Sequence, residues 1–192
     1  VYTPTHYDFA SKTFKAGWEN VEPEDYTTFA YGYGDAKEGQ PNVDVSKYFT
    51  QSTKSEDVNN AYQSYIYLAQ IMNMNKNYEQ GRDYARKAYA LDKTNGEPFI
   101  IIGQLYAASA KDCGSGNFYS KTAYWAAVDQ FEKAKAVDPS IAKKANELIN
   151  TYVHYFPAVE DIFFNGFEVG QDFTLDECWI NETTKVRAAK TN

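Results

Sequence analysis

The strongest constraint on this chain is a regular spacing of apolar and small residues over two consecutive segments. Such residues recur three and four positions apart from residue 62, stop at the polar triplet 75–77, and resume up to residue 95. This periodicity predicts two amphipathic helices joined by a tight turn. Because Gly81 and Ala85 fall on the stripe of the second helix, a neighbouring helix can approach it closely.

Weaker forms of the same two-helix pattern lie on both sides of residues 62–95. Upstream, residues 26–61 are predicted to be a degenerate repeat, and residues 5–18 the second helix of a truncated one. Downstream, residues 96–141 are predicted to be a third repeat, and residues 141–155 a closing helix. Twelve extra residues separate the helices of the third repeat, and their small, polar character predicts a loop around 110–122.

The helical periodicity ends at a proline, and residues 157–192 are predicted to be mostly irregular. This tail holds five Phe or Trp residues, which is too many for a free segment, so we expect it to pack on the last repeats. Short extended pieces are predicted at 173–175 and 178–180. Residues 186–192 are expected to fray.

Charge and hydropathy argue against a nucleic-acid partner and against a transmembrane segment. The chain carries 26 acidic and 19 basic residues, for a net charge of −7, so no basic face is expected that could neutralise nucleic-acid phosphates. No apolar run approaches the roughly 18 residues of a membrane span. We therefore predict no nucleic-acid partner and no transmembrane segment. The first residues also lack the basic start and apolar segment of a signal peptide.

The residues that carry enzyme chemistry are sparse. His6 and His154 are the two histidines of the chain, and neither lies in a recognisable set of nucleophile, base and orienting carboxylate. Gly114-Ser115-Gly116 lacks the lysine and the preceding strand of a phosphate-binding loop. We predict no catalytic residues, no metal site and no cofactor, and we expect the protein not to be an enzyme.

The two cysteines, Cys113 and Cys178, lack the spacing of a metal site. They are either a disulfide that joins the insertion to the tail or two free thiols in a reducing compartment. We favour the disulfide, because both segments need an anchor, and it would stabilise the fold by about 2–4 kcal/mol.

The helical pattern resembles the tetratricopeptide repeat (TPR) family. An aromatic, a leucine and a small residue on the first helix precede tyrosine and two alanines on the second, at Tyr65, Leu68, Ala69, Tyr78, Ala85 and Ala88. The resemblance implies an all-α, right-handed solenoid of antiparallel helix hairpins. It would comprise about three repeats and a closing helix over residues 1–156, followed by the C-terminal tail.

A finer resemblance covers residues 60–187. Its most specific part is Cys-Trp-Ile-Asn-Glu-Thr-Thr at 178–184, which is similar to the C-terminal region of exported TPR proteins of Bacteroidetes. This resemblance implies export to the periplasm or the outer membrane, an oxidising setting that agrees with a disulfide. It also implies that further repeats precede residue 1.

In TPR proteins the first helices of the repeats line a concave groove that binds extended protein segments. In this register the groove residues would be Gln63, Ile66, Gln70, Asn73, Glu97, Ile100, Gln104, Asn146 and Asn150. Amide side chains can pair with an extended backbone, although each of these residues could equally be an ordinary solvated helix position.

Two functions follow as expectations. The first is a non-enzymatic scaffold of the bacterial cell envelope that binds a protein or peptide segment, alone or within a larger envelope complex. The second is an accessory protein that binds a glycan or other small ligand through exposed aromatic residues. The 17 tyrosines and three tryptophans motivate the second, but the same aromatics also explain repeat packing.

Overall fold

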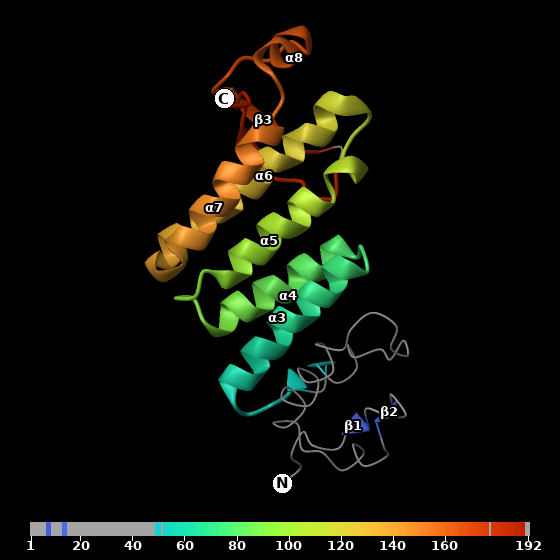
Figure 1. Cartoon of the computed structure of the whole chain (residues 1–192), viewed down its shortest axis with the longest axis vertical. Helices are drawn as coiled ribbons and strands as arrows, with labels where there is room; N and C mark the ends of the chain where they lie inside the picture. Colours follow the sequence, from blue (N-terminus) through green and yellow to red (C-terminus); the bar gives the residue numbers. More distant parts are fainter. Residues whose placement is uncertain (1–6, 9–12, 15–48, 51, 177, 191–192) are drawn as a thin grey trace. The chain divides into compact units, whose positions relative to one another are not determined.

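The structure is a computed structural model that describes residues 7–8, 13–14, 49–50, 52–176 and 178–190 (Figure 1). The chain divides into two compact units, residues 1–68 and 69–192.

In the first unit, strands β1 (Tyr7–Asp8) and β2 (Thr13–Phe14) pair antiparallel, with Tyr7 opposite Phe14. The helix predicted over 5–18 is therefore wrong at these residues. Aromatic and β-branched residues favour strands, and a short apolar pattern does not distinguish the two structures. The rest of that segment, and residues 26–48 and 51 of the degenerate repeat, lie outside the described residues.

Helix α3 (Val58–Met74) begins in the first unit and ends in the second. It starts four residues before the predicted boundary because Asp57 caps it. The Oδ1 atom of Asp57 accepts hydrogen bonds from the backbone N–H groups of Asn59 and Asn60, at 2.8 and 3.4 Å. The helix ends at the predicted turn, where Lys76 adopts a φ of 58°.

The second unit is mostly helical, as predicted, and its long helices pack against one another in chain order (Figure 1). Short 3₁₀ turns join or extend them. The elements are α4 (Tyr78–Leu91), α5 (Glu97–Ala108), η3 (Ala110–Asp112), α6 (Gly116–Val137), η4 (Pro139–Ile141), α7 (Ala142–Tyr152) and η5 (Val153–Tyr155). The predicted closing helix is thus present as α7 with a 3₁₀ turn at each end.

Helix α5 is the centre of this unit because it packs between α4 and α6. Its residues from Pro98 to Gly103 are all buried, so this stretch of the helix is enclosed by the protein on every side. Gly103 marks the closest approach to α6. A Cβ atom there would overlap the Phe131 ring and lie 2.8 Å from the carbonyl oxygen of Ala127.

The predicted loop at 110–122 is wrong over its second half, where α6 already begins at Gly116. The reason is a helical spacing of buried residues, Phe118, Thr122 and Trp125, which are four and three positions apart. Much of the insertion therefore lengthens α6, and the connecting loop is short.

The tail folds back on the helices, as predicted. It contains α8 (Val159–Phe164) and an antiparallel pair, β3 (Asp172–Thr174) with β4 (Thr183–Lys185), in which Phe173 lies opposite Thr184. Residues 178–180 form a turn rather than the predicted extended piece. Residues 186–190 do not fray, because Val186 is buried and the N–H of Ala189 donates to the carbonyl of Pro157 at 2.9 Å.

Candidate functional site

The predicted groove residues fall into two groups. Ile66 and Ile100 are only 2% and 1% exposed, so they belong to the core and the prediction of a groove role for them is wrong. Each is an apolar residue for which burial is favourable, and Ile100 lies on the centrally packed α5. The other seven are at least partly accessible, namely Gln63, Gln70, Asn73, Glu97, Gln104, Asn146 and Asn150.

Two of these seven, Asn73 and Gln104, meet in an open pocket of about 560 Å³. We call it the tyrosine pocket, because three of its lining residues are tyrosines. It draws side chains from α3, α5 and α6, and from α7 with η5. Its lining consists of Asn73, Gln104, Ala107, Ala108, Tyr124, Thr151, Tyr152 and Tyr155.

The three tyrosine rings form one cluster. Tyr124 stacks on Tyr152 with centroids 5.8 Å apart, and Tyr155 lies 5.3 Å from Tyr124 and 6.1 Å from Tyr152. Tyr152 also stacks on the buried Phe131 at 5.6 Å, which fixes the cluster to the core. Tyr155 is 52% exposed, so the cluster presents ring surface to solvent.

The tyrosine pocket is polar but uncharged. Burial, then the neighbouring tyrosines, raises the pKa of Tyr124, and burial followed by Tyr155 raises the pKa of Tyr152. Both hydroxyls therefore stay protonated near neutral pH. Within the described part of the chain, the amide groups of Asn73 and Gln104 make no hydrogen bond and remain available to a ligand. The pocket can offer donors, acceptors and ring faces.

The remaining accessible groove residues lie elsewhere. Gln63 belongs to the first unit, and Gln70, Glu97, Asn146 and Asn150 do not line the pocket. From α7 and η5, the residues that line the pocket are Thr151, Tyr152 and Tyr155 rather than the predicted Asn146 and Asn150.

Sequence reasoning missed the tyrosines because their helical spacing was interpreted as core packing. Tyr152 does contact the core, but its ring also borders the pocket. A signal that could have identified them is the presence of three tyrosines at helical positions, Tyr124, Tyr152 and Tyr155, since tyrosine often bridges an apolar core and solvent.

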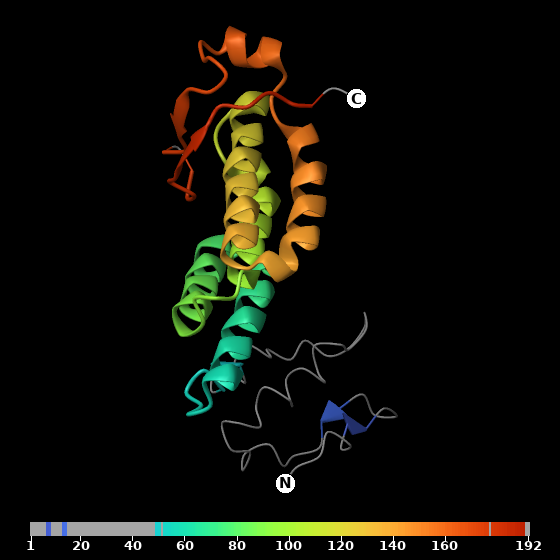
Figure 2. The same ribbon diagram turned by 90° about the vertical axis from the view of Figure 1, so that its left-hand side faces the viewer.

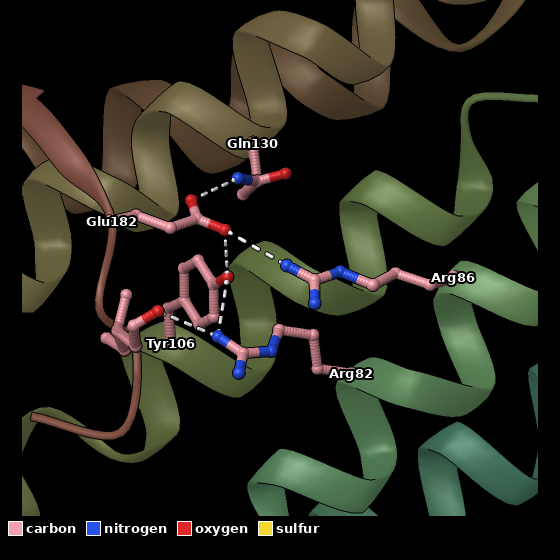
Figure 3. Close-up of polar contacts among 6 residues, drawn as sticks. Arg82, Arg86, Tyr106, Gln130 and Glu182 are labelled. Atoms are coloured by element: carbon pink, nitrogen blue, oxygen red, sulfur yellow. Dashed lines mark hydrogen bonds and ion pairs between the residues drawn. The ribbon is translucent and has the colours of Figure 1, made fainter.

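The tail binds the helices through a polar group that we call the Glu182 cluster (Figure 3). One carboxylate oxygen of Glu182 accepts from the Tyr106 hydroxyl at 2.6 Å and lies 3.5 Å from an Arg86 nitrogen. The other accepts from Gln130 Nε2 at 2.8 Å. Arg82 completes the cluster by donating to the carbonyl of Ile180 at 2.7 Å. Glu182 thus connects α4, α5 and α6, and both of its carboxylate oxygens bond to side chains of the protein.

Further contacts extend this attachment on both sides. The indole N–H of Trp179 donates to the Ser109 hydroxyl at 3.0 Å, and the Arg82 guanidinium lies 4.8 Å from the Trp179 ring centroid. On α6, Trp125 and Arg187 exchange hydrogen bonds, from the indole to the Arg187 carbonyl at 2.7 Å and from the guanidinium to the Trp125 carbonyl at 2.6 Å. The tail is therefore an integral part of the fold.

The tail leaves the tyrosine pocket open. Among the residues that the structure describes, none after Tyr155 lines the pocket. On α5, Gln104 faces the pocket while Tyr106 binds the tail, and two positions on a helix point about 200° apart. The β3–β4 pair and α7 accordingly lie on opposite sides of the α5–α6 pair (Figure 2).

Cys113 and Cys178 form the predicted disulfide, with Cα atoms 4.8 Å apart. It joins the turn after η3 to the segment that carries Trp179. A pocket of about 300 Å³ lies beside it, bordered by Tyr119 and Phe173.

Two absences hold for the residues that the structure describes. No three His, Cys, Asp or Glu side chains gather into a group that could hold a metal ion. No helix in this part of the chain is both long and apolar enough to cross a membrane.

In comparisons with protein-family models, with curated proteins and with solved structures, this chain has no significant match.

Proposed function

We propose that the protein is a non-enzymatic, TPR-type scaffold that binds an extended segment of a partner protein in the tyrosine pocket. The observation that carries this proposal is the pocket itself, an open hollow with three tyrosines and two available amides that the described part of the tail leaves uncovered. Seven of its eight lining residues lie on α3, α5 and α7 with η5, and this supports the proposal. In the predicted register α3 and α5 are first helices of repeats and α7 is the closing helix, all of which were expected to line the groove.

The chemistry of the lining suits an extended peptide. Asn73 and Gln104 can each donate to a carbonyl and accept from an N–H, as backbone recognition requires. Tyrosine supplies large contact area at low cost in conformational entropy. Because none of the described residues that line the pocket is charged, we expect the bound part of the partner to be uncharged.

The proposed compartment is the bacterial cell envelope. Its support is the disulfide between Cys113 and Cys178, since disulfides persist mainly in oxidising compartments. The resemblance of segment 178–184 to exported Bacteroidetes proteins agrees with this assignment.

Site-specific photo-crosslinking in the source cells tests the proposal. A photoreactive residue at Gln104 or Thr151, both in the pocket, should join to one discrete polypeptide. The same residue at Glu79, which is exposed on α4 outside the pocket, is the matched control. The variant Tyr124→Ser/Tyr155→Ser should abolish the adduct without unfolding the chain. Adducts of equal yield at Glu79, or adducts that persist in this variant, would contradict the proposal.

The alternative is a glycan-binding accessory protein, and the same pocket supports it. A ring face beside neutral donors and acceptors can hold a sugar as well as a peptide. A glycan array distinguishes the two functions. A hit that is lost in Tyr124→Ser/Tyr155→Ser, without a polypeptide adduct in cells, would favour the glycan function over the scaffold.

A further inference from the structure

A second surface, distinct from the tyrosine pocket, lies on α8 and the segment that follows it. Four large apolar side chains are exposed there, Val159 by 54%, Phe163 by 77%, Phe164 by 82% and Val169 by 58%. They border an open hollow of about 500 Å³. We call it the α8 surface. Two nearly bare phenylalanines side by side are unusual on a free protein surface.

The backbone holds these side chains outward. Ile162, on the same helix, is only 2% exposed, so this side of α8 packs against the protein. The N–H of Phe167 donates to the carbonyl of Ile162 at 3.1 Å, and Asn165 Nδ2 donates to the carbonyl of Asp161 at 2.7 Å. Since the turn after α8 is fixed in this way, the exposed rings form a preorganised surface.

Acidic groups flank the apolar side chains. Glu160 and Glu168 both line the hollow, and neither forms an ion pair with any residue that the structure describes. The nearby acids Asp161 and Asp172 are already paired, with Lys121 at 3.7 Å and with Lys185 at 2.7 Å. The hollow therefore combines an apolar floor with two unneutralised carboxylates.

We propose that the α8 surface docks a protein segment that presents a bulky apolar side chain flanked by lysine or arginine. The apolar side chain would fill the hollow against Phe163 and Phe164, and the basic residues would pair with Glu160 and Glu168. A symmetric pair of this chain would bring like-charged carboxylates together, and an anionic lipid surface would meet the same charges. Charge complementarity thus favours a basic partner segment over both.

Peptide display tests this chemistry and does not require that the partner be identified. The probe is a random 12-residue peptide library selected on the whole, disulfide-bonded chain, with the variant Phe163→Ser/Phe164→Ser used to remove peptides that bind elsewhere. We expect the surviving peptides to carry Leu, Phe or Trp with Lys or Arg on both sides. Their affinity should fall by at least about ten-fold on the variant. Both phenylalanines are exposed, so the variant should keep the thermal stability of the parent.

A charge reversal provides the second arm. Glu160→Lys/Glu168→Lys should weaken the selected basic peptides by about ten-fold or more and should shift a new selection toward acidic flanks. Peptides without basic residues, or unchanged affinity in both variants, would overturn the proposal. A dimer that sedimentation analysis detects and the serine variant dissolves would overturn it in favour of a second copy. Vesicles with and without anionic lipid test a membrane as the partner. Vesicle binding that is lost in the serine variant, together with no peptide binding, would overturn the proposal in favour of a membrane.

Discussion

Gly103 and Gly81 show that two glycines on neighbouring helices can differ in how strictly they are required. At Gly103 an added Cβ atom would meet the Ala127 carbonyl oxygen at 2.8 Å, which is backbone and cannot rotate away. At Gly81 the nearest atom is a terminal methyl carbon of Leu105 at 2.9 Å, which can move. The close approach of α5 to α6 therefore depends on glycine more than the packing around Gly81 does.

We expect Gly103→Ala to lower the free energy of unfolding by about 1–3 kcal/mol through overpacking. This would occur although alanine is favoured over glycine in a helix by about 1 kcal/mol. Gly81→Ala should cost less. Ala136→Leu, at an exposed position of α6, is the control and should stay within about 0.5 kcal/mol of the parent. Urea denaturation measures all three, and a neutral Gly103→Ala would refute the packing of α5 on α6.

Tyr106 gives the fold a dependence on alkaline pH. Its hydroxyl is buried and donates to Glu182, and burial first, then this bond, raises its pKa well above the usual value of 10. At pH values between 10, the usual pKa, and the raised pKa of the folded chain, Tyr106 keeps a proton in the folded chain that it has lost in the unfolded chain. The contribution of Tyr106 to the free energy of unfolding is thus fully present below about pH 10 and is lost as the pH rises above it.

Tyr106→Phe tests this linkage. At pH 7 the variant should be less stable by about 1–2 kcal/mol, because Glu182 loses a hydrogen-bond donor. Above about pH 10 the variant should lose stability less steeply than the parent. Denaturation curves at several pH values between about 7 and 12 provide the comparison, and parallel losses in the two proteins would contradict the prediction.

The disulfide between Cys113 and Cys178 stabilises the attachment of the tail to the helices. It closes a loop between positions 65 residues apart, for which chain entropy gives about 4 kcal/mol. We expect Cys113→Ser/Cys178→Ser to lower the free energy of unfolding by about 2–4 kcal/mol. The tail should stay bound, because the bonds from Trp179 to Ser109 and from Arg82 to Ile180 remain.

Reductant should lower the melting temperature of the parent and leave that of the serine variant unchanged. Thiol labelling of the unreduced protein gives an independent answer. Two labelled cysteines would rule out the bridge.

The helices α4, α5 and α7 could be predicted from sequence because local spacing determines which of their residues are buried. Gly81, Ala85 and Ala88 are buried as the pattern requires. The start of α6 was missed because the polar residues 114–117 signal a loop and outweighed the helical spacing that begins at Phe118. Local spacing therefore predicts which helices form better than it predicts where they begin.

The arrangement of the tail could not be predicted in detail. Its aromatic content showed that it packs on the helices, but its specific bonds join residues far apart in sequence. Arg82 and Ile180 are separated by 98 positions, and Gln130 and Glu182 by 52. No spacing rule in one sequence reports such pairs.

The candidate site was predictable in part on α3 and α5, where Asn73 and Gln104 line the pocket. Gln104 is a polar residue on an otherwise apolar helix. Its amide has no reason to be buried, so it indicates the exposed side. On α7 the same reasoning selected Asn146 and Asn150 and passed over Tyr152. A half-buried tyrosine belongs to the core and to the pocket at once, and the sequence does not separate these roles.

At the scale of the second unit, the arrangement of helices alone would predict weak cooperativity. Each long helix contacts the next in chain order, and arrays that depend on nearest neighbours can lose their end helices first. The Glu182 cluster changes this expectation. Through Arg86, Tyr106 and Gln130, one carboxylate joins three consecutive helices. We therefore expect α4, α5 and α6 to unfold together.

Native-state hydrogen exchange of Glu182→Ala tests this coupling. Removal of the carboxylate leaves the buried Tyr106 hydroxyl without an acceptor for its proton, at a cost of about 1–3 kcal/mol. It should also remove the bond from Arg86 and leave Arg82 to Ile180 as the hydrogen bond from α4 to the tail. The amides of α4 should therefore open at lower free energy than those of α6, whereas the parent should show one common value. Glu168→Ala, an exposed acid in the same tail, is the control and should preserve the common value. If the three helices lose protection equally, Glu182 contributes to global stability but does not couple them. Loss of a coupling contact should lower the opening free energy of α4 more than that of α6.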